Sequence, residues 1–245
     1  MEESDLLATI VVLFIPLTSL IIALFAGNIF NPYWFQFGIK SGSSASFNNG
    51  ARVEIQTIVP QNITNGSLVF WVGETLSNGA FLQVGYTINN KVDPRNAEWF
   101  YEYFPSNAQG SFLFHGNYSG AIGHDGSAGA NGTFHTYGFY SIGNTWYFTF
   151  DGKVIGNVVL GTNNSGINAP EAIGELDEVN TNNIYIKDVI FSNLSVYKYG
   201  LWLPVSSGYT YIGYGQGSNR LLKNPYKVME LNNSVNYFAV GSGFQ

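Results

Sequence analysis

An uninterrupted run of uncharged residues near the N-terminus, Leu6–Ala26, constrains this chain more than any other feature of its sequence. A helix of that length, at ~1.5 Å per residue, covers about 30 Å, which is the thickness of a bilayer's hydrocarbon core. Pro16 lies within the run, but membrane helices tolerate proline when nearby hydroxyl groups satisfy the freed carbonyls. We therefore predict that residues 1–30 contain one transmembrane α-helix, followed by an interfacial aromatic belt at Tyr33, Trp34 and Phe35.

A cleavable signal peptide is the main alternative to a retained anchor. Such a peptide has a basic n-region and small residues before its cleavage site. The segment that precedes the apolar run here, Met1–Asp5, carries no positive charge, so a retained anchor is favoured. Flanking charge does not set the orientation, because the nearest basic residue is Lys40, on the C-terminal side.

Acceptor triplets for N-glycosylation indicate instead on which side of the membrane the C-terminal domain lies. Asn-X-Ser/Thr, with X never proline, occurs at Asn62, Asn65, Asn117, Asn131, Asn163, Asn193 and Asn232. A chain rich in Asn and Ser also produces such triplets by chance. All of them nevertheless follow the apolar run, and glycans are attached only on the translocated side. We expect a single-pass protein of the cell membrane whose C-terminal domain is extracellular and glycosylated.

The composition excludes several classes of function. Lys and Arg number only 10, and the net charge is −6, so the basic stripe that binds nucleic acid is missing. The count of cysteines is 0, which rules out disulfides, thiolate metal sites and Cys nucleophiles. An exported domain without disulfides is more typical of a prokaryotic cell surface, and we expect an archaeal one here. We expect no cofactor.

The rest of the chain shows the patterns of short β-strands separated by turns. Val53, Ile55 and Thr57 alternate with polar residues, and Asp151-Gly152 is typical of a two-residue hairpin. The aromatic content of 16% requires a packed core. We therefore predict a linker at 31–46 and an antiparallel β-sandwich at 47–199. The tail, 200–245, either completes or extends the sandwich or adds a strand to a neighbouring molecule.

Three segments carry a resemblance to a known family. They are GTFHTYGFYSIGNTWYFTFDGKVIG (132–156), GSLVFWVGETLSNGAFLQVGYTI (66–88) and IYIKDVIFSNLSVYKY (184–199). Together they resemble the strands and hairpins of concanavalin A-like lectin/glucanase domains of the laminin-G and laminarinase type. The resemblance implies a jelly-roll sandwich, and carbohydrate as the class of ligand.

The glucanases of that family carry the motif E-x-D-x-x-E, and this chain departs from it. Its nearest match, 175–180, ends in Asn180 where the family has an acid, and it follows the F-H-x-Y strand instead of preceding it. We interpret it as a solvated acidic loop. Glu98 and Glu102 would lie roughly 13 Å apart along a strand, too far for a catalytic carboxylate pair. No pair of histidines has metal-ligand spacing. We predict that the chain is not an enzyme and holds no metal.

Candidate ligand-binding residues come from two patterns. The Gly-rich stretch 115–132 resembles a binding loop, with His124 and Asp125 at its tip, although a mobile glycosylated loop is the favoured interpretation. Trp99, Tyr101 and Trp146 are candidates for stacking on a sugar ring, as are the neighbouring Tyr103 and Tyr147. Alternating aromatic residues in a sandwich also fill its core, and that alternative stays open for each of them.

These patterns favour a membrane-anchored, non-catalytic lectin-like domain that recognises glycans or surfaces. Two structural roles remain as alternatives: a pilin-like filament subunit, or an accessory subunit of a membrane complex that associates with partners or with its own copies through Leu6–Ala26. A pilin-like subunit normally has Lys or Arg before a cleavage point, and this chain does not. A glycoside hydrolase is the least favoured alternative.

Overall fold

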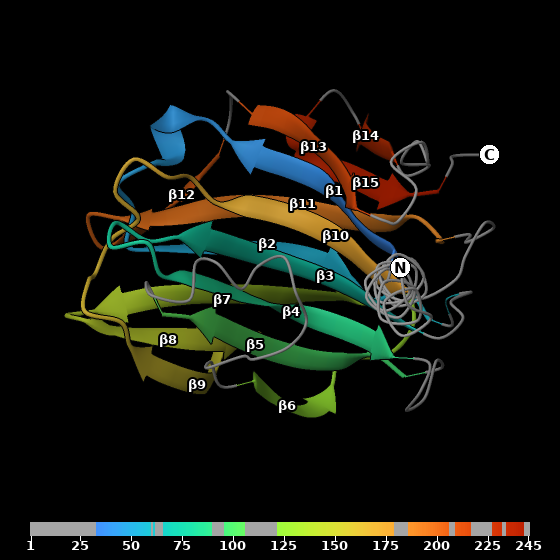
Figure 1. Cartoon of the computed structure of the whole chain (residues 1–245), viewed down its shortest axis with the longest axis horizontal. Helices are drawn as coiled ribbons and strands as arrows, with labels where there is room; N and C mark the ends of the chain where they lie inside the picture. The colour runs from blue at the N-terminus through green and yellow to red at the C-terminus, as the bar shows by residue number, and fades with distance from the viewer. Residues whose placement is uncertain are drawn as a thin grey trace, which may run out of the picture.

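Two antiparallel β-sheets, packed face to face, form most of the chain that the computed structural model describes (Figure 1). The described residues are 33–59, 61, 66–89, 96–105, 122–178, 186–205, 209–216, 227–231 and 234–242. The only helical element in these ranges is one 3-10 turn, Ser43–Ala45. The predicted mostly β, antiparallel sandwich is therefore confirmed.

Sheet A faces the viewer in Figure 1, and its strands run in the spatial order β13-β1-β10-β3-β4-β5-β6. Its members, in chain order, are β1 (Tyr33–Ser41), β3 (Gly66–Thr75), β4 (Phe81–Asn89), β5 (Glu98–Phe104), β6 (Ile122–Ser127), β10 (Glu171–Glu178) and β13 (Tyr209–Gln216).

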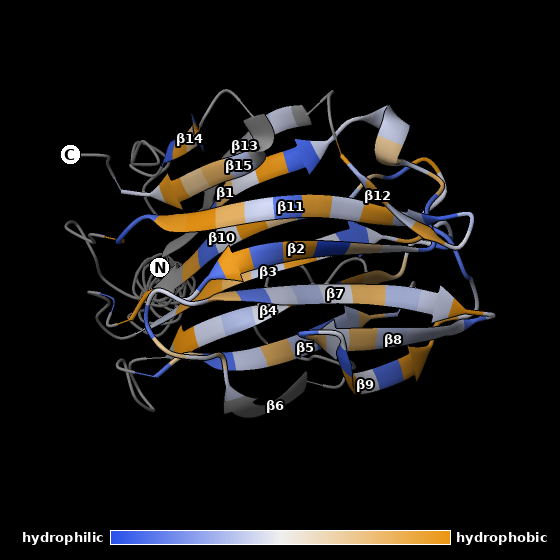
Figure 2. Ribbon diagram, turned by 180° about the vertical axis from the view of Figure 1, so that it is seen from behind, coloured by the Kyte–Doolittle hydropathy of each residue, from blue (hydrophilic) through white to orange (hydrophobic). Residues whose placement is uncertain are grey.

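Sheet B faces the viewer in Figure 2, with the order β14-β15-β11-β2-β7-β8-β9 and β12 paired to β11. Its members are β2 (Gly50–Gln56), β7 (Phe134–Ile142), β8 (Thr145–Phe150), β9 (Lys153–Val159), β11 (Val189–Lys198), β12 (Leu201–Pro204), β14 (Lys227–Leu231) and β15 (Ser234–Gly241).

The core lies between the sheets and follows from the alternation of side chains along each strand. On β2 the residues Val53 and Ile55 are fully buried, whereas Arg52 and Glu54, which alternate with them, point away from the core. The colour bands along β2 in Figure 2 show the same alternation. Large aromatic side chains fill the space between the sheets, among them Phe70, Tyr86, Tyr137, Phe139, Phe148, Phe191 and Phe238.

Glycine turns fix the hairpins that the sequence indicated. Asp151 (φ 49°) and Gly152 (φ 76°) both adopt the left-handed region between β8 and β9, as a type I′ turn requires. Gly79 (φ 84°) turns the chain between β3 and β4. These turns set the register of the strands, and thereby decide which side chains share a face.

Three expectations about chain organisation have different outcomes. The linker at 31–46 is wrong, because Tyr33–Ser41 is strand β1, paired with β10 on one side and β13 on the other. The tail 200–245 supplies β12, β13, β14 and β15 to both sheets, so it completes this sandwich. The helix at Leu6–Ala26 lies outside the described residues and stays a prediction. Within the described residues, no helix has the length and apolar character needed to cross a bilayer.

Candidate functional site

Four aromatic side chains form a row on the outer face of sheet B. Tyr147 on β8 pairs with Tyr140 on β7, and their rings lie 5.5 Å apart between centroids. Tyr197 on β11 continues the row at 6.2 Å from Tyr140, and Trp202 on β12 follows at 5.2 Å from Tyr197. All four side chains are partly exposed. We call Tyr147, Tyr140, Tyr197 and Trp202 the aromatic row.

The strand register produces this row. Each member alternates with a buried neighbour that points into the core, such as Phe139 beside Tyr140 and Val196 beside Tyr197. Gly50 on β2 lies between those two tyrosines and pairs with Tyr140. A Cβ atom at Gly50 would lie 2.4 Å from the carbonyl oxygen of Phe139, so no side chain fits there. The glycine thus lets the two rings meet across β2.

A polar groove opens at the Trp202 end of the row, with a volume of about 300 Å³. The guanidinium of Arg52 lies 4.5 Å from the centre of the Trp202 ring, a cation–π contact. Burial lowers the pKa of Arg52, and the nearby Glu54 opposes that effect. Glu54 accepts hydrogen bonds from the Ser192 hydroxyl (3.0 Å) and from Asn193 Nδ2 (2.7 Å). The groove therefore presents a cation, a carboxylate and an amide beside an aromatic ring.

The outer face of sheet A carries a different set of groups, two carboxylates held by neutral donors. Glu102 on β5 accepts a hydrogen bond from Gln83 Nε2 at 2.6 Å. Glu175 on β10 accepts one from the Trp71 indole at 3.0 Å and one from Gln36 at 3.3 Å. The strand position of Glu175 contradicts its interpretation as part of a solvated acidic loop. Ala172 and Leu176 alternate with the acidic residues of β10 and are buried, which the acidic composition concealed.

Glu102 lies in surroundings that disfavour its negative charge. Burial raises the pKa of Glu102 to about 7; the hydrogen bond from Gln83 opposes this, and the negative charge of Glu175 adds to it. Around them lies a second apolar cluster, separate from the main core and composed of Val69, Trp71, Phe81, Phe100, Phe104 and Ile173. The low dielectric of such a cluster disfavours the charged form of a carboxylic acid.

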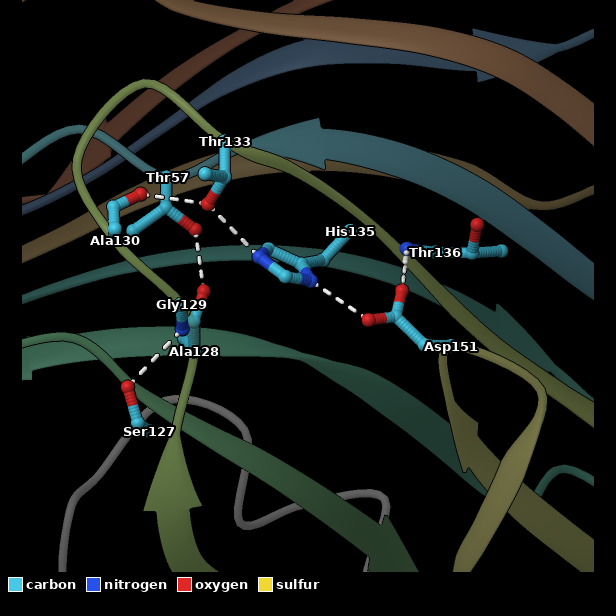
Figure 3. A network of polar contacts seen from close by, with 9 residues as sticks. All are labelled: Thr57, Ser127, Ala128, Gly129, Ala130, Thr133, His135, Thr136 and Asp151. Carbon is cyan, nitrogen blue, oxygen red and sulfur yellow. Dashed lines mark hydrogen bonds and ion pairs between the residues drawn. The ribbon is translucent and has the colours of Figure 1, made fainter.

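A network around His135 joins the start of β7 to the β8–β9 hairpin (Figure 3). His135 Nδ1 lies 2.7 Å from Asp151, and its Nε2 lies 2.8 Å from the Thr133 hydroxyl. That hydroxyl donates its single proton to the carbonyl of Ala130 at 2.6 Å. In a Ser-His-Asp type triad the hydroxyl must instead donate to the histidine. The network is therefore structural, and Gly129 accommodates the ring, because a Cβ there would lie 2.0 Å from Nε2.

The structure places three of the predicted stacking residues on the core side. Trp146 is fully buried, and its indole N–H donates to the carbonyl of Thr162 at 2.7 Å. Tyr101 stacks on Phe148 of the opposite sheet at 4.7 Å. Trp99 packs against the same core. These three residues are corrected to core positions, because alternation along β5 and β8 turns them inward. Tyr147, on β8, is the stacking candidate that faces outward.

The other predicted site residues are described only in part. His124 and Asp125 belong to strand β6, paired with β5, and not to a loop tip; their side chains lie outside what the structure describes. Asn131 and Asn163 are exposed on loops, and Asn193 is exposed on β11. Asn62, Asn65, Asn117 and Asn232 lie outside the described residues. Glycosylation at all these positions stays a prediction.

Metal ligands do not gather in the described part of the chain, where no three His, Cys, Asp or Glu side chains come together in a way that could hold an ion. The aromatic row itself was missed by sequence reasoning, apart from Tyr147. The signal that could have found it is the turn sequence Gly143-Asn144 between β7 and β8, which places Tyr140 opposite Tyr147.

No protein-family model and no curated protein matches this sequence. Solved structures with similar β-sandwiches include a galectin from Caenorhabditis elegans (10% identity, TM-score 0.35), matched over 58% of this chain and 94% of the galectin. An endo-glucanase of glycoside hydrolase family 16 from Bacteroides ovatus has 12% identity and TM-score 0.35, over 60% of this chain and 67% of that one. LamAcat from Zobellia galactanivorans has 14% identity and TM-score 0.35, over 60% and 61%. TM-scores this low carry no argument about function, so the site is interpreted from its own residues.

Proposed function

We propose that this chain is a membrane-anchored, non-catalytic glycan-binding protein whose sandwich lies outside the cell and binds a neutral polysaccharide along the aromatic row. Leu6–Ala26 is the anchor in this proposal. The jelly-roll resemblance of the sequence favours the same class of ligand.

The observation that carries the proposal is the row of four partly exposed rings on one sheet face. Sugar rings present C–H faces that pack on aromatic faces, while their hydroxyl groups need nearby polar partners. Arg52 and Glu54 supply a donor and an acceptor at one end of the row. A row extends in one direction, which suits a chain of sugars better than a single compact ligand.

The net negative charge of the protein favours neutral polysaccharides over anionic ones. The net charge is −6, so an anionic polymer is repelled over most of the surface. Within the row and its groove, Arg52 and Glu54 offset each other, so nothing there favours a polyanion. We therefore expect neutral glucans to bind and sulfated or uronic acid polymers to bind more weakly.

A binding assay with the full-length chain in mild detergent tests the proposal. Surface-immobilised protein is titrated with neutral and acidic polysaccharides, and Tyr197→Ala is compared with Tyr101→Phe, a conservative change on the core side of β5. Loss of one central ring from the row should weaken binding about tenfold, since an aromatic anchor contributes ~1–2 kcal/mol. Absence of binding to every neutral polysaccharide would refute the proposal.

The two carboxylates on sheet A favour a second candidate, a glycoside hydrolase. Acid-catalysed glycoside cleavage uses one carboxylic acid held protonated near neutral pH and a second carboxylate. Glu102 and Glu175 lie on the same face of sheet A, with strands β3 and β4 between them. Glu102 fits the acid, and Glu175, which accepts a hydrogen bond from the Trp71 indole, fits the second carboxylate. Release of reducing ends from a neutral glucan, lost in both Glu102→Gln and Glu175→Gln, would favour the hydrolase over the non-catalytic reading.

A further inference from the structure

Asn193 stands at a break in strand β11, at the edge of the polar groove. The register between β11 and β2 shifts between Ser192 and Ser195, which marks a β-bulge. Asn193 lies in that bulge with φ 55°, in the left-handed region that asparagine adopts more readily than most residues. Its side chain is therefore directed away from the ladder, and Nδ2 reaches Glu54 on the groove wall at 2.7 Å.

The groove has the size and the polar groups to hold a sugar that is attached to Asn193 itself. Asn193-Leu194-Ser195 is an acceptor triplet, and both Asn193 and Ser195 line the groove. The volume of about 300 Å³ is at the lower end of the range of ligand sites, roughly 300–1,000 Å³, so it suits one sugar unit. Trp202 and Arg52 supply a packing surface and a donor, and Thr136 supplies a hydroxyl.

We propose that Asn193 carries an N-linked sugar and that the first sugar unit packs into this groove against Trp202 and Arg52. In the transfer, Asn193 Nδ2 forms a bond to the anomeric carbon of a sugar carried on a lipid phosphate. The bond from that carbon to the phosphate oxygen breaks, the lipid phosphate leaves, and Nδ2 releases one proton. The remaining Nδ2 proton still donates to Glu54, which fixes the direction of the attached sugar.

The folded structure also indicates that the sugar is attached before strand β11 folds. Ser195, the hydroxyl residue of the triplet, is only 7% exposed, and its hydroxyl donates to the carbonyl of Asn193 at 2.9 Å. An enzyme that reads the triplet needs that hydroxyl, so the transfer precedes formation of the β11 bulge. In a folded chain that carries this sugar, Trp202 and the groove residues Arg52 and Glu54 are covered, and Tyr147, Tyr140 and Tyr197 remain for an external glycan.

Asn131 is the matched control site. It is exposed on the loop before β7, and its Oδ1 accepts a hydrogen bond from the backbone N–H of Val59 at 2.9 Å. Asn131 is absent from the groove lining. A glycan at Asn131 should therefore project into solvent, whereas a glycan at Asn193 should be shielded by the protein.

Enzymatic release of the sugars from the native protein tests this inference. The full-length chain is produced in a eukaryotic secretory host, where N-linked sugars begin with N-acetylglucosamine, and is treated with a peptide-N-glycanase. Site-resolved mass spectrometry follows the loss of sugar at Asn131 and Asn193. We expect occupancy at both sites and release from Asn193 at least tenfold slower, with equal rates after denaturation in urea. Trp202→Ala should remove the difference, whereas Tyr140→Ala should not.

Three outcomes overturn the inference, and they separate it from the proposed extracellular location on which it rests. Sugar at Asn131 but none at Asn193, or equal release from both sites in the native protein, overturns the packed sugar alone. No sugar at any triplet overturns both the packed sugar and the proposed location. If Trp202→Ala does not fold, the comparison of native with urea-denatured wild-type protein decides the matter.

Discussion

Replacement of Glu102 by glutamine should make the protein more stable at alkaline pH and leave its stability in acid nearly unchanged. Burial raises the pKa of Glu102 from 4.5 to about 7 in the folded protein. Below pH 4.5 the carboxyl group is protonated in both the folded and the unfolded chain. Between pH 4.5 and 7 the unfolded chain loses the proton first, so the free energy of unfolding falls as pH rises.

The size of the effect follows from the same shift. A shift of about 2.5 pKa units, at 1.36 kcal/mol per unit, lowers the free energy of unfolding by about 3 kcal/mol once the pH exceeds 7. For a chain of this size that corresponds to roughly 6–12 °C in Tm. Glutamine has the same shape, carries no charge and keeps an oxygen that accepts the hydrogen bond from Gln83, so the variant should escape this loss.

Urea unfolding of the full-length chain, followed by tryptophan fluorescence between pH 4 and 8.5, measures the effect. The quantity to plot is the difference in unfolding free energy between Glu102→Gln and wild type, because other buried acids such as Glu74 contribute equally to both proteins. Glu98→Gln, four residues earlier on the same face of β5, controls for loss of a carboxylate. A difference that stays flat across this pH range, or that favours the wild type at pH 8, would refute the reasoning.

Four further substitutions test the architecture by urea unfolding, and the last of them, at Gly50, is tested by glucan binding as well. Gly129→Ala should cost ~2 kcal/mol, because its Cβ would displace the His135 ring and its φ of 89° is unfavourable for alanine; an unchanged stability would contradict the network in Figure 3. Trp146→Ala should cost about 3–5 kcal/mol as a core cavity, whereas Tyr140→Ala on the outer face should cost about 1 kcal/mol or less; equal losses would contradict the assigned faces. Gly50→Ala should weaken glucan binding as well as stability, because a methyl group there separates the rings of the row; unchanged affinity would argue against the row as the site.

Local patterns were sufficient to predict the strands that alternate cleanly. Val53 and Ile55 on β2 and the Asp151-Gly152 turn followed directly from their sequence signatures. The strand β1 was missed because its aromatic residues directly follow an apolar run and so resembled an interfacial belt. Strand β10 was missed because its outer face is acidic. In both cases the partner strands that make these segments β-structure lie far away in the sequence.

The site was harder to predict than the fold, because alternation alone does not say which face of a strand is the core face. Tyr101 and Tyr147 belong to equally aromatic strands, yet one packs on Phe148 and the other faces outward. The row also depends on Tyr197 and Trp202 meeting Tyr140 across the sheet, and only the register of β11, β2 and β7 shows this. The raised pKa of Glu102 likewise depends on burial and on groups from other strands.

The most direct test of the account compares two variants on one neutral glucan, with binding and cleavage measured in the same reaction. Tyr197→Ala removes a central ring of the aromatic row, and Glu102→Gln removes the buried acid of sheet A. We expect Tyr197→Ala to weaken binding about tenfold, Glu102→Gln to bind like the wild type, and neither the wild type nor either variant to release reducing ends. Wild-type release of reducing ends that Glu102→Gln abolishes, with binding unaffected by Tyr197→Ala, would contradict glycan binding along the aromatic row.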